Sequence, residues 1–205
     1  MKLIDQIHDG YVFKRRTRVL SSHLSALLPP NVTVLDVGCG DGTLAKLIHA
    51  HRPDVQICGI DVLVRRETHI PVTAFDGAII PYAPGTFDAV MFVDVLHHTN
   101  DPVILLREAT RVARRSIIIK DHNRDGFLAG PTLRFMDWVG NVRHGVALPY
   151  NYWPERRWTK AFAELALTPT VSKTRIGLYP WPANWAFERR LHFIVRLDKR
   201  EHEAG

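Results

Sequence analysis

The chain has 205 residues, of which 46% are hydrophobic, so it can bury one full core but is short for two domains. Its net charge of +6 at neutral pH makes nucleic acid a partner to consider, whereas no apolar run approaches the roughly 18 residues that span a bilayer. Because the first ten residues lack the apolar core of a signal peptide and two cysteines are too few for a disulfide framework, we expect a cytoplasmic protein with a single domain over residues 1–205.

The first expected element is a helix within residues 1–30. Apolar residues recur at helical spacing from Val12 to Leu28, and Pro29 and Pro30 end the pattern. The same segment holds a basic cluster of Lys14, Arg15, Arg16 and Arg18. On such a helix most of these side chains face solvent, so the cluster is explained without nucleic acid, which we do not expect as a partner.

A strand over 32–37 follows and runs into a glycine-rich turn, in the sequence VLDVGCGDG of residues 34–42. Three glycines at alternate positions from Gly38 let the backbone turn sharply and leave its N–H groups exposed. The third glycine comes one residue too early for the G-x-G-x-x-G pattern of dinucleotide folds, where this chain has Thr43. Asp36 also repels phosphate but can pair with an ammonium group. The turn therefore favours a small charged ligand without a pyrophosphate.

The next elements alternate between helix and strand. We expect a helix over 43–51 and strands over 56–61, 71–75 and 87–93. Asp61 ends the second strand about twenty residues after the glycine turn, where an acid commonly takes ribose hydroxyls. Asp76 ends the third strand. The alternation predicts a parallel sheet, with a nucleoside bound at the carboxyl ends of its first strands.

This succession of motifs resembles the class I S-adenosylmethionine-dependent methyltransferases, in particular the ubiquinone and menaquinone biosynthesis group, from Val32 to about His122. The resemblance implies an α/β Rossmann-like fold, with a doubly wound seven-stranded sheet that is mostly parallel and has a C-terminal antiparallel hairpin. It implies S-adenosylmethionine as the cofactor. The cofactor-binding residues that it implies are Asp36, Gly38, Cys39, Gly40, Asp61, Val62, Asp76, Gly77 and Asp94.

Within that set, the resemblance assigns the methionine moiety to Asp36 and the glycine turn, and the ribose to Asp61. It assigns the adenine edge to Asp76 and Gly77. Asp76 also suits a simple turn without any ligand, so both interpretations stay open for it.

In the second half of the chain, we expect Asp101 to cap a helix that has Pro102 in its first turn. The elements after it are a strand over 116–120, a helix over 154–167 and β segments over 170–177 and 191–197. The last two segments match the terminal antiparallel hairpin of the family.

Polar loops follow the fourth and fifth strands, at the edge of the sheet where ligands of doubly wound folds lie. The catalytic candidates there are His97, His98, Asp121 and His122. Histidine suits a general base because its ordinary pKa is about 6.5, and either His97 or His122 could serve. The alternative is that the histidines only line the pocket or cap a helix, since a sulfonium donor is already activated.

The same loops could hold a divalent ion. The possible ligands are Asp94, His97, Asp121, His122 and Asn123. They match a metal motif poorly because they come from loops rather than from a fixed spacing. We therefore expect no metal.

The connection over 125–153 is long and rich in aromatic residues, and the resemblance makes it the substrate lid. Its candidate substrate contacts are Trp138, His144, Tyr150 and Tyr152. As a set they favour a partly apolar substrate, although each aromatic ring also suits the core. A second aromatic segment, YPWPANW of residues 179–185, is expected to pack on the body of the protein rather than on a membrane.

The sequence thus predicts an enzyme that moves a methyl group from S-adenosylmethionine to an oxygen, nitrogen or activated carbon of a small, partly apolar molecule. We expect a monomer or homodimer without a membrane partner. One alternative is a nucleotide-dependent oxidoreductase, which the glycine spacing disfavours. The other is a noncatalytic subunit that binds S-adenosylmethionine or a partner.

Overall fold

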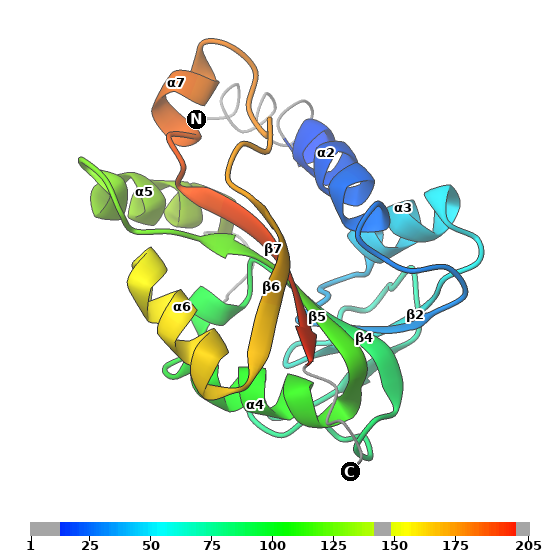
Figure 1. Cartoon of the computed structure of the whole chain (residues 1–205). Helices are drawn as coiled ribbons and strands as arrows, with labels where there is room; N and C mark the ends of the chain where they lie inside the picture. The colour runs from blue at the N-terminus through cyan, green and yellow to red at the C-terminus, as the bar shows by residue number, and fades with distance from the viewer. Residues whose placement is uncertain (1–12, 142–148, 200–205) are drawn as a thin grey trace.

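The computed structural model describes residues 13–141 and 149–199, which form one seven-stranded sheet with helices on both faces (Figure 1). The strand order is β3-β2-β1-β4-β5-β7-β6. The strands are β1 Thr33–Val37, β2 Gln56–Asp61, β3 Val72–Ala74, β4 Phe87–Val93, β5 Ala113–His122, β6 Leu167–Lys173 and β7 His192–Lys199. Strands β1 to β5 pair in parallel, and β7 is antiparallel to both β5 and β6. The predicted fold class is confirmed.

Helices cover both faces because the strands are apolar on both sides, as in other parallel sheets. The helices are α2 Phe13–Ser25, α3 Thr43–His51, α4 Pro102–Val112, α5 Ala129–Asn141, α6 Glu155–Glu164, α7 Ala183–Phe187 and the short 3₁₀ helix η2 Leu96–His98. Val34 packs with α2 and α3, whereas its neighbour Leu35 packs with α4 and α6. This alternation makes the sheet doubly wound, with two separate cores.

The start of α4 agrees with its sequence signals. The Asp101 side chain accepts a hydrogen bond from the backbone N–H of Val103 at 3.0 Å, and Pro102 occupies the first turn. Proline fits there because the first N–H groups of a helix lack intrahelical partners. The cap fixes where the chain leaves η2, which carries two of the catalytic candidates.

Some predicted boundaries were wrong. Strand β5 starts three residues earlier than expected and continues to His122, because β4 pairs with it on one side and β7 on the other. The hairpin strand predicted over 170–177 is β6 and ends at Lys173. The extension of β5 carries two polar residues, Asp121 and His122, into the buried part of the sheet.

The basic cluster of α2 does not all face solvent. Lys14 and Arg18 are exposed, but Arg15 donates to the carbonyl of Gly177 at 3.1 Å and Arg16 pairs with Asp94 at 3.4 Å. The expectation of a solvated face is thus wrong for two of the four side chains, since α2, which lies beside α3 (Figure 1), also borders the cavity that holds Asp36 and Asp94. Within residues 13–141 and 149–199, no helix combines the length and apolar character needed to cross a membrane.

Candidate active site

The glycine turn after β1 has the geometry that the sequence predicts. Gly38, Gly40 and Gly42 have φ angles of +72°, +60° and +77°, in the left-handed region that favours glycine. A Cβ atom on Gly38 would lie 2.5 Å from Cγ2 of Val95, whereas a Cβ atom on Gly40 would meet no atom within 4 Å. The turn therefore packs tightly beneath Gly38 and leaves open space at Gly40.

Asp61 ties this turn to the end of β2. Its Oδ2 atom accepts a hydrogen bond from the Gly40 N–H at 2.8 Å, and its Oδ1 atom accepts one from the Leu63 N–H at 2.8 Å. An ionised carboxylate has about four acceptor positions, so two remain for further donors. This geometry is compatible with the predicted contact to ribose hydroxyls.

Asp36 lies at the floor of a cavity of about 200 Å³ and is almost completely buried. Burial, reinforced by the charge of Asp61, raises the pKa of Asp36 to about 8. A carboxyl group in this position gains most from a cation placed beside it. Gly38 and Asp94 border the same cavity, and Arg16 of α2 covers it.

Cys39 borders this cavity, and its side chain packs against β2. A Cβ atom on Gly59 of β2 would lie 2.3 Å from the Cys39 Sγ atom, so the thiol packs against the bare backbone of Gly59. Burial raises the pKa of Cys39 above its ordinary value, which keeps it a neutral thiol.

Exposed apolar side chains continue the surface beyond β2 and β3. Val62 is 63% exposed and Ile79 is 64% exposed, although both are aliphatic. A Cβ atom on Gly77 would lie 3.1 Å from Cγ1 of Val62, so these two predicted cofactor residues are neighbours. Asp76 accepts hydrogen bonds from the N–H groups of Ala78 and Ile79, both at 2.8 Å. Its turn role is thus present, and its adenine contact stays a prediction.

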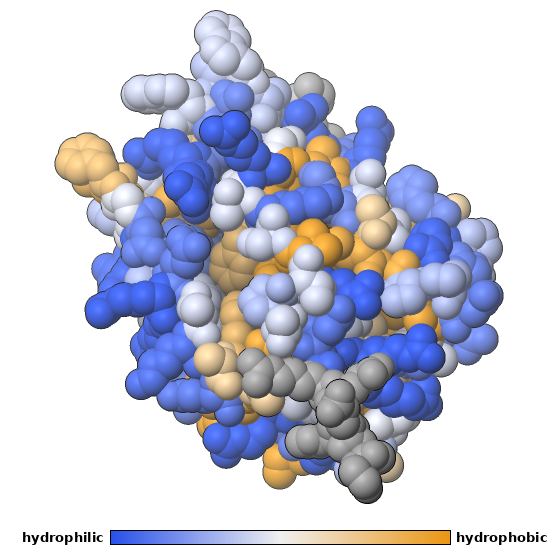
Figure 2. All heavy atoms as spheres, in the orientation of Figure 1, coloured by the Kyte–Doolittle hydropathy of each residue, from blue (hydrophilic) through white to orange (hydrophobic). Residues whose placement is uncertain are grey.

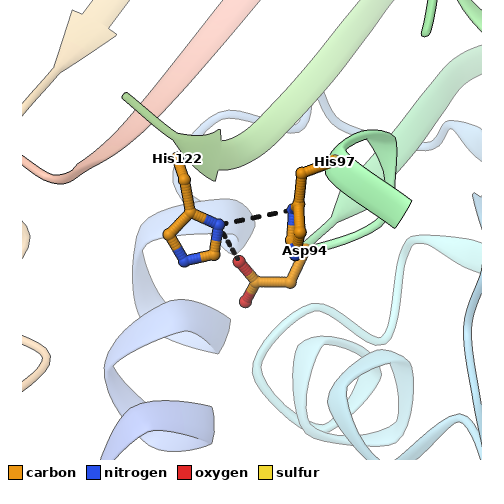
Figure 3. A group of neighbouring side chains, drawn as sticks. All are labelled: Asp94, His97 and His122. Atoms are coloured by element: carbon orange, nitrogen blue, oxygen red, sulfur yellow. Dashed lines mark hydrogen bonds and ion pairs between the residues drawn. The ribbon is translucent and has the colours of Figure 1, made fainter. Parts of the chain in front are cut away.

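The catalytic candidates gather in one buried polar cluster at the ends of β4 and β5. Nδ1 of His97 donates to Oδ1 of Asp121 at 2.7 Å, and Nδ1 of His122 lies 3.3 Å from Nδ1 of His97. Figure 3 shows these two ring nitrogens facing each other, with Asp94 beside His122. The His98 ring lies against His97, at 4.1 Å between centroids. The sequence predicts that His97, His98, Asp121 and His122 lie close together at the ends of β4 and β5, and this geometry is consistent with that prediction.

The two histidines at the centre of the cluster carry different charges. Burial lowers the pKa of His97, but the carboxylates of Asp121 and Asp137 outweigh it and raise that pKa to about 10. Burial lowers the pKa of His122 to about 4, aided by the charges of Lys120 and His97. At neutral pH, His97 is therefore an imidazolium and His122 is a neutral imidazole. The Nδ1 proton of His97 goes to Asp121, whereas Nδ1 of His122 faces the carboxylates of Asp121 at 3.5 Å and Asp94 at 3.7 Å, so the proton of the neutral His122 ring belongs on Nδ1 and the lone pair on Nε2.

Asp94 connects this cluster to the cavity of Asp36. It follows β4 with φ of +58°, an uncommon conformation for a residue other than glycine. The buried ammonium group of Lys120 forms an ion pair with Asp94, and Arg16 approaches it from the other side. Burial alone would raise the pKa of Asp94, but these cations hold it well below its ordinary value. Asp94 therefore stays ionised.

The charges of the cluster balance among the described residues. Three carboxylates, Asp94, Asp121 and Asp137, face three cations, Arg16, Lys120 and protonated His97. Two groups have metal-like spacing, namely Asp94 with His97 and His122, and His97 with His98 and Asp137. A divalent ion there would have to displace the Lys120 ammonium group or the His97 proton, so this donor set fits a metal poorly.

The predicted lid residues do not all lie beside the polar cluster. The buried Tyr152 hydroxyl donates to Asp137, and its ring stacks on His97 with centroids 5.4 Å apart. Tyr150 is half-buried beside Tyr152, whereas Trp138 is 54% exposed and lies away from the cluster. His144 lies outside the described residues, and its predicted substrate contact stays a prediction.

Three members of the cluster were missed in the sequence. Arg16 looked like one more solvated residue on α2, and Asp137 looked like the polar face of α5. Lys120 offered a usable signal, since a lysine that ends the apolar run SIIIK inside a sheet needs a buried acid. Its partner Asp94 was among the predicted residues.

Comparison with known proteins agrees with this geometry. Residues 11–170 match the family model described as "Methyltransferase domain", which covers more than half of the chain. The chain therefore belongs to the methyltransferase domain family, whose cofactor is S-adenosylmethionine, as predicted.

Two curated relatives show the breadth of this family. The chain is 28% identical over 131 residues to 27-O-demethylrifamycin SV methyltransferase of Amycolatopsis mediterranei, an alignment that covers 54% of this chain and 48% of the relative. It is 30% identical over 136 residues to 2-methyl-6-phytyl-1,4-hydroquinone methyltransferase of Synechocystis sp., which covers 62% of this chain and 37% of the relative. The chain thus spans about half or less of the length of these relatives.

Solved structures support the fold. Geranyl diphosphate methyltransferase in complex with S-adenosylmethionine superposes with a TM-score of 0.65 at 16% identity, over 89% of this chain and 85% of that chain. An S-adenosylmethionine-dependent methyltransferase from Mesorhizobium loti gives 0.64 at 16% identity, over 87% and 96%. At these identities the likeness concerns the fold alone.

Proposed function

We propose that this protein transfers a methyl group from S-adenosylmethionine to an oxygen, nitrogen or activated carbon atom of a small, partly apolar molecule, and releases S-adenosylhomocysteine. Family membership supports the transfer. The observation that carries the proposal is the position of Asp94, which borders the cavity above Asp36 and also belongs to the cluster of His97 and His122. A cofactor site and acid–base groups thereby share one edge of the sheet.

For the cofactor, the fit rests on the buried carboxyl of Asp36, the open space at Gly40 and the remaining acceptor positions of Asp61. The buried carboxyl of Asp36 has a raised pKa and gains from the ammonium group of the methionine moiety. The open space at Gly40 admits a ligand close to the backbone. Asp61 keeps acceptor positions for ribose, and Val62 and Gly77 offer an apolar surface to adenine, with Asp76 at its rim.

For the chemistry, S-adenosylmethionine would supply, when bound, a methyl group activated by its sulfonium, and an electron pair of the acceptor atom would replace the carbon–sulfur bond and leave S-adenosylhomocysteine. The acceptor then carries one proton too many. We assign His122 to take that proton, because a neutral imidazole has a lone pair and the imidazolium of His97 has none. His97 and Asp121 position His122, and His98 lines the pocket.

The acceptor is proposed to lie under the segment over 125–153. Tyr150 and Tyr152 give this cover aromatic surface next to His97, and Trp138 lies on its outer side. Such rings favour an acceptor with an apolar part. We propose that the partner is a small molecule and not a nucleic acid, and that the protein is a monomer or homodimer. We also propose that it lies in the cytoplasm, where the free thiols of Cys39 and Cys58 stay reduced.

The test is calorimetric titration with S-adenosylmethionine, S-adenosylhomocysteine and NAD, followed by the same titrations on Gly40→Ala. The two sulfur nucleosides should bind, NAD should not, and the added methyl group should weaken binding. The matched control is Gly177→Ala, because Gly177 also has a left-handed φ, of +78°, and open space around its Cβ position. Equal losses in both variants would mean that backbone strain, and not a ligand contact, acts at Gly40.

Methyl transfer is then measured with labelled S-adenosylmethionine and a panel of small hydroxyl, amine and quinol compounds. Label in any of these products supports the enzyme. Tight cofactor binding without transfer to any compound in the panel would favour the noncatalytic subunit instead.

A further inference from the structure

Two tryptophans of the segment over 179–185 project into solvent. Trp181 is 83% exposed and Trp185 is 81% exposed, whereas Tyr179 at the start of the segment is buried. The expectation that this segment packs on the body of the protein is therefore correct for Tyr179 and wrong for both indoles. The reason is that α7 has only five residues, of which Ala183 and Phe187 pack against the core and Trp185 faces solvent.

Helix α5 and the loop before it add further exposed apolar side chains at the same end of the molecule (Figure 1). Arg189 after α7 donates to the Thr132 hydroxyl of α5 at 2.9 Å, and the Phe135 and Phe187 rings lie 6.4 Å apart. The two helices are thus neighbours. We call this surface the aromatic end, made of Phe127, Leu128, Phe135, Trp138, Trp181 and Trp185.

Arginines lie at the base of α7. Arg175, Arg189 and Arg190 are exposed and line a hollow of about 530 Å³. Glu188, the one acid of that hollow, accepts a hydrogen bond from the Leu178 N–H. In Figure 2 hydrophilic side chains, drawn in blue, flank this upper part of the molecule. The aromatic end therefore combines protruding indoles with a positive rim.

We propose that the aromatic end docks on the surface of an anionic lipid bilayer. Trp181 and Trp185 enter the boundary between headgroups and acyl chains, where an indole keeps its N–H group near water. Arg175 and Arg190 bind the lipid phosphates. This proposal departs from the expectation of no membrane partner, and it does not depend on the methyl acceptor.

The shape of the aromatic end favours a lipid surface over a protein partner. The hydrophobic core of a protein interface is a contiguous patch with a matching partner surface. Here the most exposed rings, Phe127, Trp181 and Trp185, each keep more than four fifths of their surface in water, so they project separately. A fluid bilayer accommodates separate projections, and its negative charge complements the arginines.

The experiment is sedimentation of the full chain with vesicles of phosphatidylcholine, with and without phosphatidylglycerol. We expect binding to the anionic vesicles, weakening with salt, with a blue shift of tryptophan fluorescence. The double variants Trp181→Ala/Trp185→Ala and Arg175→Gln/Arg190→Gln should each bind much more weakly, by about thirtyfold for the arginine pair.

The matched control is Ile104→Ala/Arg107→Gln, since both residues are exposed on α4, at the opposite end of the molecule (Figure 1). It should bind as the parent does. Unchanged thermal unfolding of all variants checks that they fold. Failure to bind anionic vesicles, equal binding to neutral vesicles, or binding that both aromatic and arginine variants retain would overturn the proposal.

Discussion

The Nδ1 atom of His97 lies 2.7 Å from Oδ1 of Asp121, and both side chains are almost completely buried. The second oxygen of Asp121 accepts a hydrogen bond from the Leu96 N–H at 3.0 Å. One carboxylate at the end of β5 thus holds both the backbone and the side chain of η2. The orientation of His97 is set by a strand 24 residues further along the chain.

The charge of His97 should make stability depend on alkaline pH. The pKa of His97 rises from 6.5 to about 10 on folding, so its contribution to stability is complete below pH 6.5 and is lost as the pH rises toward 10. Urea unfolding between about pH 8 and 9.5 should show a free energy that falls by at most about 1.4 kcal/mol per pH unit. His97→Gln should flatten this slope, and the exposed-site control His51→Gln should keep it. A slope that survives in His97→Gln would contradict a charged His97.

Cofactor binding should release a proton from Asp36. The pKa of the empty site is raised to about 8, and an ammonium group favours the ionised carboxylate. Affinity for S-adenosylhomocysteine should therefore rise with pH between about pH 6 and 7.5, by up to about tenfold per unit. Calorimetry in buffers of different ionisation enthalpy measures the released proton directly.

Two variants test whether the pH dependence of cofactor affinity comes from Asp36. Asp36→Asn should abolish the pH dependence, whereas Asp41→Asn, at the rim of the same cavity, should retain it. Pairing of the ammonium group with some other acid would leave the dependence intact in Asp36→Asn.

His122 should act as a base without an ordinary histidine pH profile. Its pKa is lowered to about 4, so it is neutral throughout the usual assay range. At saturating cofactor, kcat should stay level between about pH 6 and 9, and His122→Ala should lower kcat by about 10²-fold to 10⁴-fold with little change in the KM for S-adenosylmethionine. His98→Ala should lower kcat far less. A limb of the profile near pH 6.5 would instead point to a base with an unshifted pKa.

The buried ion pair between Lys120 and Asp94 should matter for stability. Lys120→Met leaves the Asp94 carboxylate with Arg16 alone, and breaking a buried pair on one side costs about 3 kcal/mol. Lys160→Met removes an exposed pair with Glu164 and should cost less than about 0.5 kcal/mol. Urea unfolding measures both, and equal costs would show that Lys120 gains nothing from its partner.

Much of the fold was predictable because its signals are local. Glycines at alternate positions, acids at strand ends and the cap at Asp101 each act within a few residues, and each appears in the structure where the sequence places it. The antiparallel pairing of β6 with β7, which the resemblance to the family implies, is also confirmed, although the boundaries of these strands differ from those predicted.

The rest depends on contacts between distant segments. Helical periodicity shows which side of α2 is apolar, but not that Arg16 on this helix borders the cavity and pairs with Asp94, so its role went unrecognised. Asp137 of α5 lies 3.3 Å from Nε2 of His97, a contact between distant segments that no local pattern reveals. The aromatic segment around Trp181 was expected to pack on the body of the protein, and its composition does not reveal that Ala183 and Phe187 of α7 face the core while Trp181 and Trp185 face solvent.

The position of β7 also constrains the order in which the molecule is assembled. Although it is the last described strand, β7 lies inside the sheet between β5 and β6, and His192 faces His122 across that pairing. A ribosome therefore releases β5 with one hydrogen-bonding edge open until residues 192–199 have emerged. During that interval the apolar strand is available to other chains, and the polar cluster lacks one of its walls. The polar cluster is enclosed only when β7 has been inserted between β5 and β6.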